Sequence, residues 1–282
     1  MWRYRRAQEQ ARIISELKAI GCYVAYDFEI QENQYGELIY FRNSKSSISE
    51  SLLKWLGPDF FHEVAAAEAR DSHSGHPKSD EEISQFWTAV VGFSKLRLLD
   101  SDAAWCRSQE FNQVAGKESL RAVTISGHHL TNAQLKTIGS IPNLQAIDIY
   151  LNRSEIDDDG VNELSRLKQL RSISIDCFRL LDNSDDEPPI TGAAVTNLCR
   201  CTKLESVVLP FKRLNNNSAR ELAKLPHLRR LDLSHSDLSD AGIAHFKNSL
   251  ELEEIVINHT GVSGPGFLQL RELPRVRKLC MQ

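Results

Sequence analysis

The sequence lacks any apolar run of the roughly 18 residues that a membrane-spanning helix needs. Its longest apolar stretches, such as Phe86–Phe93, are far shorter, and the basic start Met1–Arg6 is not followed by the apolar segment of a signal peptide. A charge excess is also missing, because 34 Lys and Arg stand against 38 Asp and Glu, a net charge of −4. The composition therefore provides no bulk attraction to nucleic acid or anionic lipid, and we expect no nucleic-acid partner.

Cysteines are few and irregularly spaced, and none forms a C-x-x-C motif; they stand at positions 22, 106, 177, 199, 201 and 280. This spacing indicates neither a zinc site nor a disulfide scaffold, and it favours reduced thiols in a cytosol-like compartment. The sequence motifs of serine hydrolases, zinc proteases and phosphate-binding loops are absent as well. We therefore expect no catalytic residues, no metal and no cofactor.

What the sequence does contain is a repeat. Similar segments follow one another at steps of 24, 26, 34, 24, 24 and 24 residues, and they open at Leu120, Leu144, Leu170, Leu204, Leu228, Leu252 and Val276. Each is apolar at offsets 0, 3 and 5, as in Leu228, Leu231 and Leu233. The alternation between offsets 3 and 5 predicts a short strand with one buried face.

The second half of each unit has helical spacing. Offsets 15, 18 and 21 are apolar, as in Val161, Leu164 and Leu167, which predicts a helix of about two turns. Residues that accept hydrogen bonds from free helix amides stand just upstream, and we predict four helix caps at Thr131, Asp158, Thr191 and Asp240. A strand and a helix this short bury their apolar faces only when neighbouring units stack on them.

The predicted architecture is therefore α/β, a right-handed solenoid with a parallel sheet inside and short helices outside. Two weaker units open near Phe61 and at Leu96, which brings the expected number of strands to nine. We place a small N-terminal α/β cap at residues 1–60 and the solenoid at 61–282, with insertions near 70–82 and 178–189.

The segment from Leu228 to Phe246, L-R-R-L-D-L-S-H-S-D-L-S-D-A-G-I-A-H-F, resembles the repeat of bacterial leucine-rich-repeat proteins, close to the ribonuclease-inhibitor-like subclass. The likeness runs from about Leu96 to the end, and the N-terminal part resembles the leader of such proteins. The resemblance implies protein binding. It also implies a transmembrane helix upstream of such a leader, so the expected location is cytoplasmic, or at a membrane through a segment outside this chain.

Two surfaces are candidates for binding. On the solvent side of the strands, offset 1 alternates between Arg and Glu, so that Glu205 can bridge Arg171 and Arg229, and Glu253 can bridge Arg229 and Arg277. Such a self-neutralising row favours a structural role. The binding candidates on this face are Asp148, Tyr150 and Asp232.

The second surface is an acidic rim on the turns between strand and helix. Its candidate residues are Glu155, Asp157, Asp182, Asp185, Asp186 and Glu187. We expect either solvated loops or a surface that steers a basic partner; calcium is a weaker alternative, because no known loop spacing is present.

Histidines and cysteines complete the expectations. His235 and His259 should stack on neighbouring turns, but no third ligand stands at the same offset, which favours exposed turn histidines over a metal site. His73 and His76 lie with Asp71 and Asp80 in a polar insertion, where a solvated loop is favoured over a weak metal site. Cys201 occupies the helix stripe and should be buried and unpaired. The last repeat should form an ordered final strand in a protein that is mainly monomeric.

These observations favour a non-catalytic scaffold that binds a protein partner whose identity the sequence does not reveal. The first alternative is a small-molecule or carbohydrate binder on the concave face. The second is a hydrolase-type enzyme, which would require a deep polar pocket with convergent ionisable groups.

Overall fold

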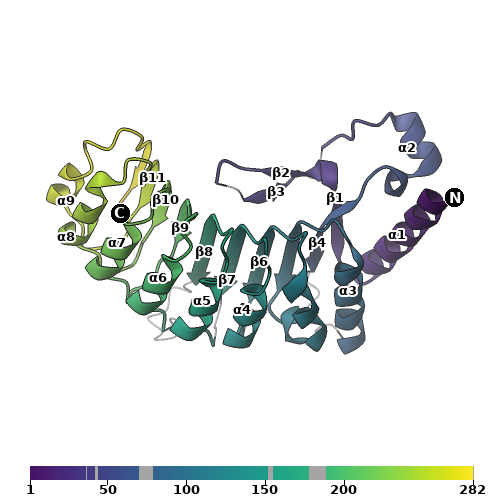
Figure 1. Cartoon of the computed structure of the whole chain (residues 1–282), viewed down its shortest axis with the longest axis horizontal. Coiled ribbons are helices and arrows are strands. Elements are labelled where there is room, and N and C mark those ends of the chain that lie inside the picture. Colours follow the sequence, from purple (N-terminus) through teal and green to yellow (C-terminus); the bar gives the residue numbers. More distant parts are fainter. Residues whose placement is uncertain (36, 42–43, 70–78, 152–154, 178–188, 282) are drawn as a thin grey trace.

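The structure is a computed structural model, and it describes residues 1–35, 37–41, 44–69, 79–151, 155–177 and 189–281. A ten-stranded sheet forms its spine (Figure 1), in the order β1-β4-β5-β6-β7-β8-β9-β10-β11-β12. β1 (Tyr23–Tyr26) runs antiparallel to β4, and the strands from β4 onward are parallel to one another. These are β4 (Val64–Ala69), β5 (Leu98–Asp102), β6 (Ala122–Gly127), β7 (Ala146–Leu151), β8 (Ser172–Cys177), β9 (Ser206–Val208), β10 (Arg230–Asp232), β11 (Glu254–Val256) and β12 (Lys278–Cys280).

The strand register follows the sequence repeat. Leu231 pairs with Val207 on one side and with Ile255 on the other, each 24 residues away. Across the longest unit, Ser172 still pairs with Ser206, 34 residues further along the chain, so the register is kept. The nine predicted strands are confirmed, including the two weak ones, β4 and β5, and the ordered final strand β12.

Short helices cover one face of the sheet (Figure 1). Their buried residues are those of the predicted stripe, for example Val161 and Leu164, which meet the strand residues in one continuous core. The helices on this face are α3 (Asp80–Gly92), α4 (Asn132–Ile138), α5 (Asp158–Leu164), α6 (Gly192–Leu198), α7 (Asn216–Leu222), α8 (Asp240–Ile243) and α9 (Gly264–Leu268), with the 3₁₀ helices η3 (Trp105–Arg107), η4 (Gln109–Gly116) and η5 (Ala244–Asn248). α3 begins inside the insertion predicted near 70–82.

Cys201 lies in this core as predicted. Its side chain is 1% exposed, and its thiol is free and directed at the carbonyl oxygen of Leu164, 3.7 Å away. Cys199 is partly exposed and also carries a free thiol. Burial raises the pKa of the Cys201 thiol to about 11, so the group stays protonated and behaves as a small apolar side chain.

The helix caps differ from the prediction at two of four positions. Thr131 and Thr191 are caps, but Asp157 caps α5 and Ser239 caps α8, where we had predicted Asp158 and Asp240. Asp158 and Asp240 are instead the first residues inside their helices. From there each carboxylate reaches forward to the cap of the next repeat and accepts hydrogen bonds from both its backbone N–H and its hydroxyl.

This forward contact recurs along the solenoid. Asp240 bonds Ser263 at 2.6 Å, and Asn216 accepts from the Ser239 amide at 3.0 Å while its own amide donates to the Ser239 hydroxyl at 2.8 Å. Asn132 makes the equivalent pair of bonds with Asp157. Each repeat thus satisfies a free amide at the helix start of its successor, which ties neighbouring units together.

The forward contact also explains a glycine. The third residue of α5, α8 and α9 is Gly160, Gly242 and Gly266, and a Cβ at each would collide with the forward-reaching Asn132, Asn216 or Asp240 side chain. The D-A-G element of the repeat is therefore a matched pair, in which one residue reaches forward and a glycine in the next repeat leaves room for it.

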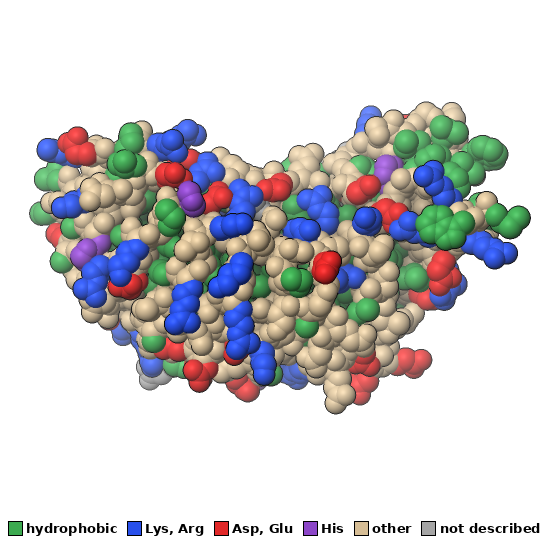
Figure 2. Space-filling view, viewed as in Figure 1, with side chains coloured by type: hydrophobic (Ala, Val, Ile, Leu, Met, Phe, Trp, Pro, Cys, Tyr) green, Lys and Arg blue, Asp and Glu red, His purple; other side chains and the backbone are tan. Residues whose placement is uncertain are grey.

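The N-terminal cap consists of α1 (Trp2–Ala19), β1, the 3₁₀ helices η1 (Asp27–Glu29) and η2 (Pro58–Phe60), α2 (Glu50–Leu56) and a hairpin of β2 (Ile30–Glu32) and β3 (Leu38–Tyr40). Figure 1 shows the hairpin extending back over the sheet, on the face opposite the helices. Exposed apolar and basic side chains gather at the end that carries α1 and α2 (Figure 2), where Trp2 and Trp55 are 71% and 77% exposed. Within the described residues, no helix combines the length and apolar character that a bilayer crossing requires.

Candidate functional site

The predicted Arg–Glu row is formed on the concave face. Arg171, Glu205, Arg229 and Glu253 each stand one residue before a strand, and their backbones hydrogen-bond in series at 2.7 Å. Glu205 bridges Arg171 (2.7 Å) and Arg229 (3.5 Å), as predicted. Glu253 pairs with Arg229 at 2.7 Å, whereas in the described part of the chain no ion pair joins it to Arg277.

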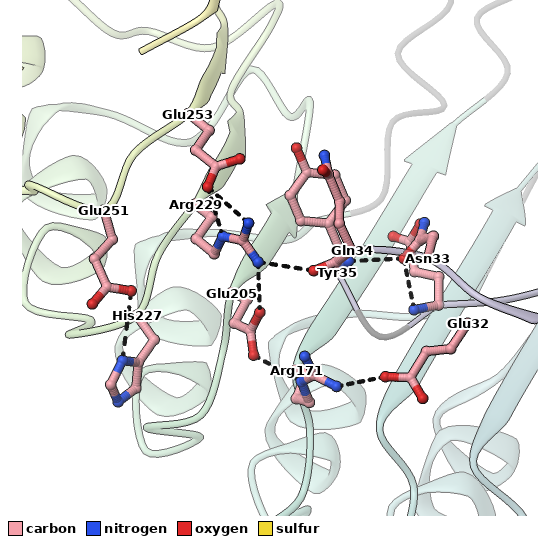
Figure 3. Close-up of polar contacts among 11 residues, drawn as sticks. Glu32, Asn33, Gln34, Tyr35, Arg171, Glu205, His227, Arg229, Glu251 and Glu253 are labelled. Carbon is pink, nitrogen blue, oxygen red and sulfur yellow. Dashed lines mark hydrogen bonds and ion pairs between the residues drawn. The ribbon is translucent and has the colours of Figure 1, made fainter. Parts of the chain in front are cut away.

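The row does not use all the donors of its arginines (Figure 3). Arg171 uses Nε for Glu205, and its Nη1 donates to Glu32 of the hairpin at 2.8 Å. Arg229 uses Nε and Nη2 for Glu253, while Nη1 donates to the backbone carbonyl of Gln34 at 2.8 Å. The glutamates therefore orient the guanidinium groups, and the remaining N–H groups bind another segment of polypeptide.

The tip of the hairpin is held on both sides. Tyr35 is 7% exposed, and the guanidinium groups of Arg229 and Arg230 lie 5.6 and 6.0 Å from the centroid of its ring. Asn33 shapes the turn, because its side-chain oxygen accepts from the amides of Tyr35 and Glu37. Glu37 in turn accepts from Ser172 at 2.8 Å and lies 3.9 Å from Arg230.

The base of the hairpin rests on small strand residues. Ala122 and Ala146 of β6 and β7 form a separate apolar cluster with Ile30, against which Leu38 and Tyr40 pack. Alanine at these positions lets the hairpin approach the sheet closely. The hairpin therefore covers the N-terminal ends of the strands from β5 to β10. It occupies part of the face that the sequence analysis describes as the solvent side of the strands.

Two of the three predicted concave-face residues come together. Burial raises the pKa of Asp148, and the charge of Glu37 adds to this rise, whereas the nearby Ser174 and Tyr150 hydroxyls lower the pKa by less than burial raises it. One oxygen of Asp148, Oδ1, is buried without a partner in the described residues. Tyr150 remains 47% exposed, and burial together with the Asp148 charge raises its pKa to about 12.

Asp232, the third predicted residue, has a local contact. Its Oδ1 accepts from the amide of Ser234 at 3.0 Å, where the chain leaves β10. This bond stabilises a turn, so the structure does not join Asp232 to the Asp148–Tyr150 pair.

The acidic rim is described only in part. Asp157 caps α5 by accepting from the amides of Asp159 and Gly160, which is a structural role. Glu155 is exposed, lies 3.9 Å from His129, and lines an open cavity of about 610 Å³ together with residues of η3, η4 and α4. The remaining rim candidates lie outside the described residues: Asp182, Asp185, Asp186 and Glu187.

Neither the thiol beside this cavity nor the pair of stacked histidines of the later repeats forms a reactive site in the described residues. Cys106 borders it, but burial raises the pKa of its thiol to about 12, which keeps the thiolate nucleophile from forming at neutral pH. His235 and His259 stack as predicted, with ring centroids 4.6 Å apart. In the ranges that the structure describes, no three His, Cys, Asp or Glu side chains gather as a metal site would need, and His73 and His76 lie outside those ranges.

One constellation was missed by the sequence reasoning. In the cap, His62 Nε2 lies 2.7 Å from the Ser46 hydroxyl and His62 Nδ1 lies 2.8 Å from Asp27, which is the connectivity of a Ser-His-Asp triad. However, the Asp27 side chain is 50% exposed, and the Ser46 oxygen also accepts from the amide of Ile48. None of the three residues borders the described cavity. We therefore interpret the His62–Ser46 contact as structural, because it joins the segment before α2 to the rest of the cap.

Comparisons with known proteins support the fold. No family model and no curated protein matches the sequence, but 161 chains of solved structures match the fold. One is an internalin from Listeria monocytogenes, with a TM-score of 0.52 and 12% identity over 77% of this chain. This chain spans 62% of the internalin, and at this identity the likeness concerns the fold alone; the ribonuclease-inhibitor-like subclass stays a prediction. Repeat, sheet and structural likeness together show that the chain has the leucine-rich-repeat solenoid fold.

Proposed function

We propose that this chain is a non-catalytic scaffold that binds a protein partner on the concave face of the solenoid. One observation carries the proposal: this face already binds a polypeptide segment, the chain's own hairpin. Arg229 contacts the backbone of Gln34, and Arg171 contacts the Glu32 carboxylate. A face that binds both backbone and side chains is suited to polypeptide, whereas sites for small molecules are usually concave pockets.

The proposal is tested by capturing partners from native extract with the full chain and two matched variants. The concave variant combines Tyr150→Ala with Arg229→Ala. The control combines Lys136→Ala in α4 with Lys224→Ala in the turn after α7, on the opposite face. We expect the same proteins to bind the wild type and the control, and to be lost with the concave variant. Retention by the concave variant, with its fold intact by circular dichroism, would contradict the proposal.

A hydrolase is the second candidate, and the Ser46–His62–Asp27 arrangement is the observation that favours it. Its test is direct. A fluorophosphonate probe labels a serine only when a base activates its hydroxyl for attack. We expect no labelling of the full chain beyond the level of the Ser46→Ala variant; labelling that depends on Ser46 would establish the enzyme and displace the scaffold proposal. Monomeric state and the cytoplasmic or membrane-tethered location remain predictions.

A further inference from the structure

We propose that the hairpin β2–β3 is a displaceable occupant of the concave face, and that the partner of this face carries a segment of the same chemistry. That segment is a turn or extended stretch with an aromatic ring between two carboxylates, in the spacing of Glu32, Tyr35 and Glu37. The inference rests on the proposed function of the face, which is protein binding. It adds the chemistry of the partner's segment and the displacement of the hairpin that lets this segment bind.

The concave face contacts three features of the hairpin. Arg171 takes the first carboxylate, at 2.8 Å from Glu32. Arg229 and Arg230 place their guanidinium planes beside the Tyr35 ring. Ser172 and Arg230 receive the second carboxylate, that of Glu37. Because these contacts run from β8 to β10, they define the length and the charge of the segment that fits.

The hairpin is held by side chains rather than by the sheet ladder. It forms a separate two-stranded sheet, which is marginal alone in water. Its ion pairs are partly exposed, with side-chain exposures of 30% for Arg171 and 42% for Glu32, so water and salt weaken them. At the tip, the buried side chain is that of Tyr35, which is 7% exposed. The solenoid core, by contrast, is continuous from β4 to β11 without any hairpin residue.

The fit of the hairpin is incomplete. Two polar atoms of the concave strands, Asp148 Oδ1 and Ser206 Oγ, are buried and have no hydrogen-bond partner in the described residues. Arg230 Nε also lacks a hydrogen bond there, but it lies 3.7 Å from the Glu254 carboxylate. Ser206 lies in register between Ser172 and Arg230, both of which contact Glu37. Unsatisfied buried polar atoms are unfavourable, so a segment that bonds them in addition to the arginines would displace the hairpin.

The experiment measures binding of a labelled peptide of residues 27–41 to the full chain. In the released variant, Tyr35→Ala with Glu37→Ala, the side-chain contacts of Tyr35 and Glu37 are removed while the receptor residues are intact. We expect the peptide to bind the released variant at least tenfold more tightly than the wild type, because the wild-type face is occupied. A peptide with Tyr35→Ala, and one of scrambled order, should bind at least tenfold more weakly than the native peptide.

Receptor variants provide the matched control. Adding Arg229→Ala to the released variant should weaken peptide binding at least tenfold, whereas Arg277→Ala, at the same repeat position but without a hairpin contact, should not change it. Equal binding to the wild type and released variant would overturn the inference, as would insensitivity to Arg229→Ala. Absence of peptide binding, with hydrogen exchange showing that the hairpin is released, would overturn it too.

The outcomes separate this inference from the proposed function. If the released variant instead forms a concentration-dependent dimer and excludes the peptide, the occupant is a second copy and the inference is wrong. If the peptide does not bind, but the capture of proteins still depends on Arg229 and Tyr150, the inference is wrong and the scaffold proposal is retained. Better capture by the released variant than by the wild type supports both.

Discussion

The guanidinium group of Arg229 lies 5.6 Å from the centroid of the Tyr35 ring and donates to the carbonyl of Gln34 at 2.8 Å, across 195 positions of sequence. Glu205 and Glu253 fix the orientation of this arginine from either side. Arg229 therefore joins the N-terminal cap to the solenoid, and the two glutamates of the Arg–Glu row hold its guanidinium group in the orientation that this contact needs (Figure 3).

The first prediction concerns Tyr35. Tyr35→Ala removes the ring that both arginines contact, and we expect the amides of β2 and β3 to lose protection from hydrogen exchange while those of β6–β8 keep theirs. The free energy of unfolding should fall by about 1–3 kcal/mol, less than the ~3–5 kcal/mol of a core aromatic, because the hairpin can leave without opening the sheet. Tyr35→Phe retains the ring and should behave as the wild type. Joint loss of protection in the hairpin and in β6–β8 would show that the hairpin is integral to the sheet.

The second prediction concerns the glycines that receive the forward contacts. Gly242→Ala would drive a Cβ into the Asn216 side chain, and we expect it to lower the free energy of unfolding by about 1–3 kcal/mol in urea titration. Gly264→Ala is the matched control, because it also lies in the first turn of a helix but has open space around its Cβ. The control should be neutral or stabilising by up to about 1 kcal/mol. Equal effects of the two substitutions would remove the steric explanation.

The third prediction separates two neighbouring asparagines. Asn216 bonds Ser239 of the next repeat, whereas Asn217 is exposed in the same helical turn. Asn216→Ala should cost about 1–2 kcal/mol of unfolding free energy, as expected for a lost cap, and Asn217→Ala should cost less than about 0.5 kcal/mol. If both cost the same, the effect would come from helix propensity and not from the contact between repeats.

Most of the solenoid could be predicted from the sequence, because its units repeat one physical solution. Leu231, Ile255 and their equivalents recur at fixed offsets, and stacking is the only arrangement that buries them all. The caps at Asp158 and Asp240 were wrong for a related reason. The prediction assumes that a carboxylate near a helix start accepts hydrogen bonds from its own helix. In a stacked array the next repeat is equally close, and these carboxylates accept from its cap residue instead.

The site could be predicted less well. The Arg–Glu row follows from the repeat, but its occupant does not, because contacts between Arg171 and Glu32 or between Arg229 and Gln34 join segments that share no pattern. The stretch Glu32–Gln34, followed by Tyr35 and a glycine, does carry the signal of a turn between two short strands. That signal predicts a hairpin, but not the face against which it packs. Asp148 was identified for its position on the strand, whereas the effect of the charge of the hairpin residue Glu37 on its pKa could not be predicted from that position.

The fourth prediction is a pH dependence with opposite signs at two carboxylates. Burial raises the pKa of Asp148 in the folded chain, so the folded state holds this proton more tightly than the unfolded state does. The contribution of Asp148 to stability therefore falls as pH rises from the unfolded value of about 3.9 through the raised folded value, and the ionised group destabilises the fold at pH 7. Asp148→Asn should raise the urea midpoint at pH 7, and this gain should shrink as pH falls toward 4.

Asp240 provides the comparison for this pH prediction. Hydrogen bonds from Ser263 lower its pKa, so its stabilising contribution is present above the unfolded pKa of about 3.9 and is lost as pH falls through the lower folded value. Asp240→Asn keeps one acceptor oxygen but loses the charge, and it should lower the urea midpoint at pH 7 by an amount that shrinks on acidification. The measurement is a set of urea titrations of the wild type and both variants between about pH 3.5 and about pH 7, from near the ordinary pKa of a carboxyl group to neutrality. If Asp148→Asn lowers the midpoint at pH 7 as Asp240→Asn does, the ionised Asp148 stabilises the concave face, and its burial does not destabilise the fold.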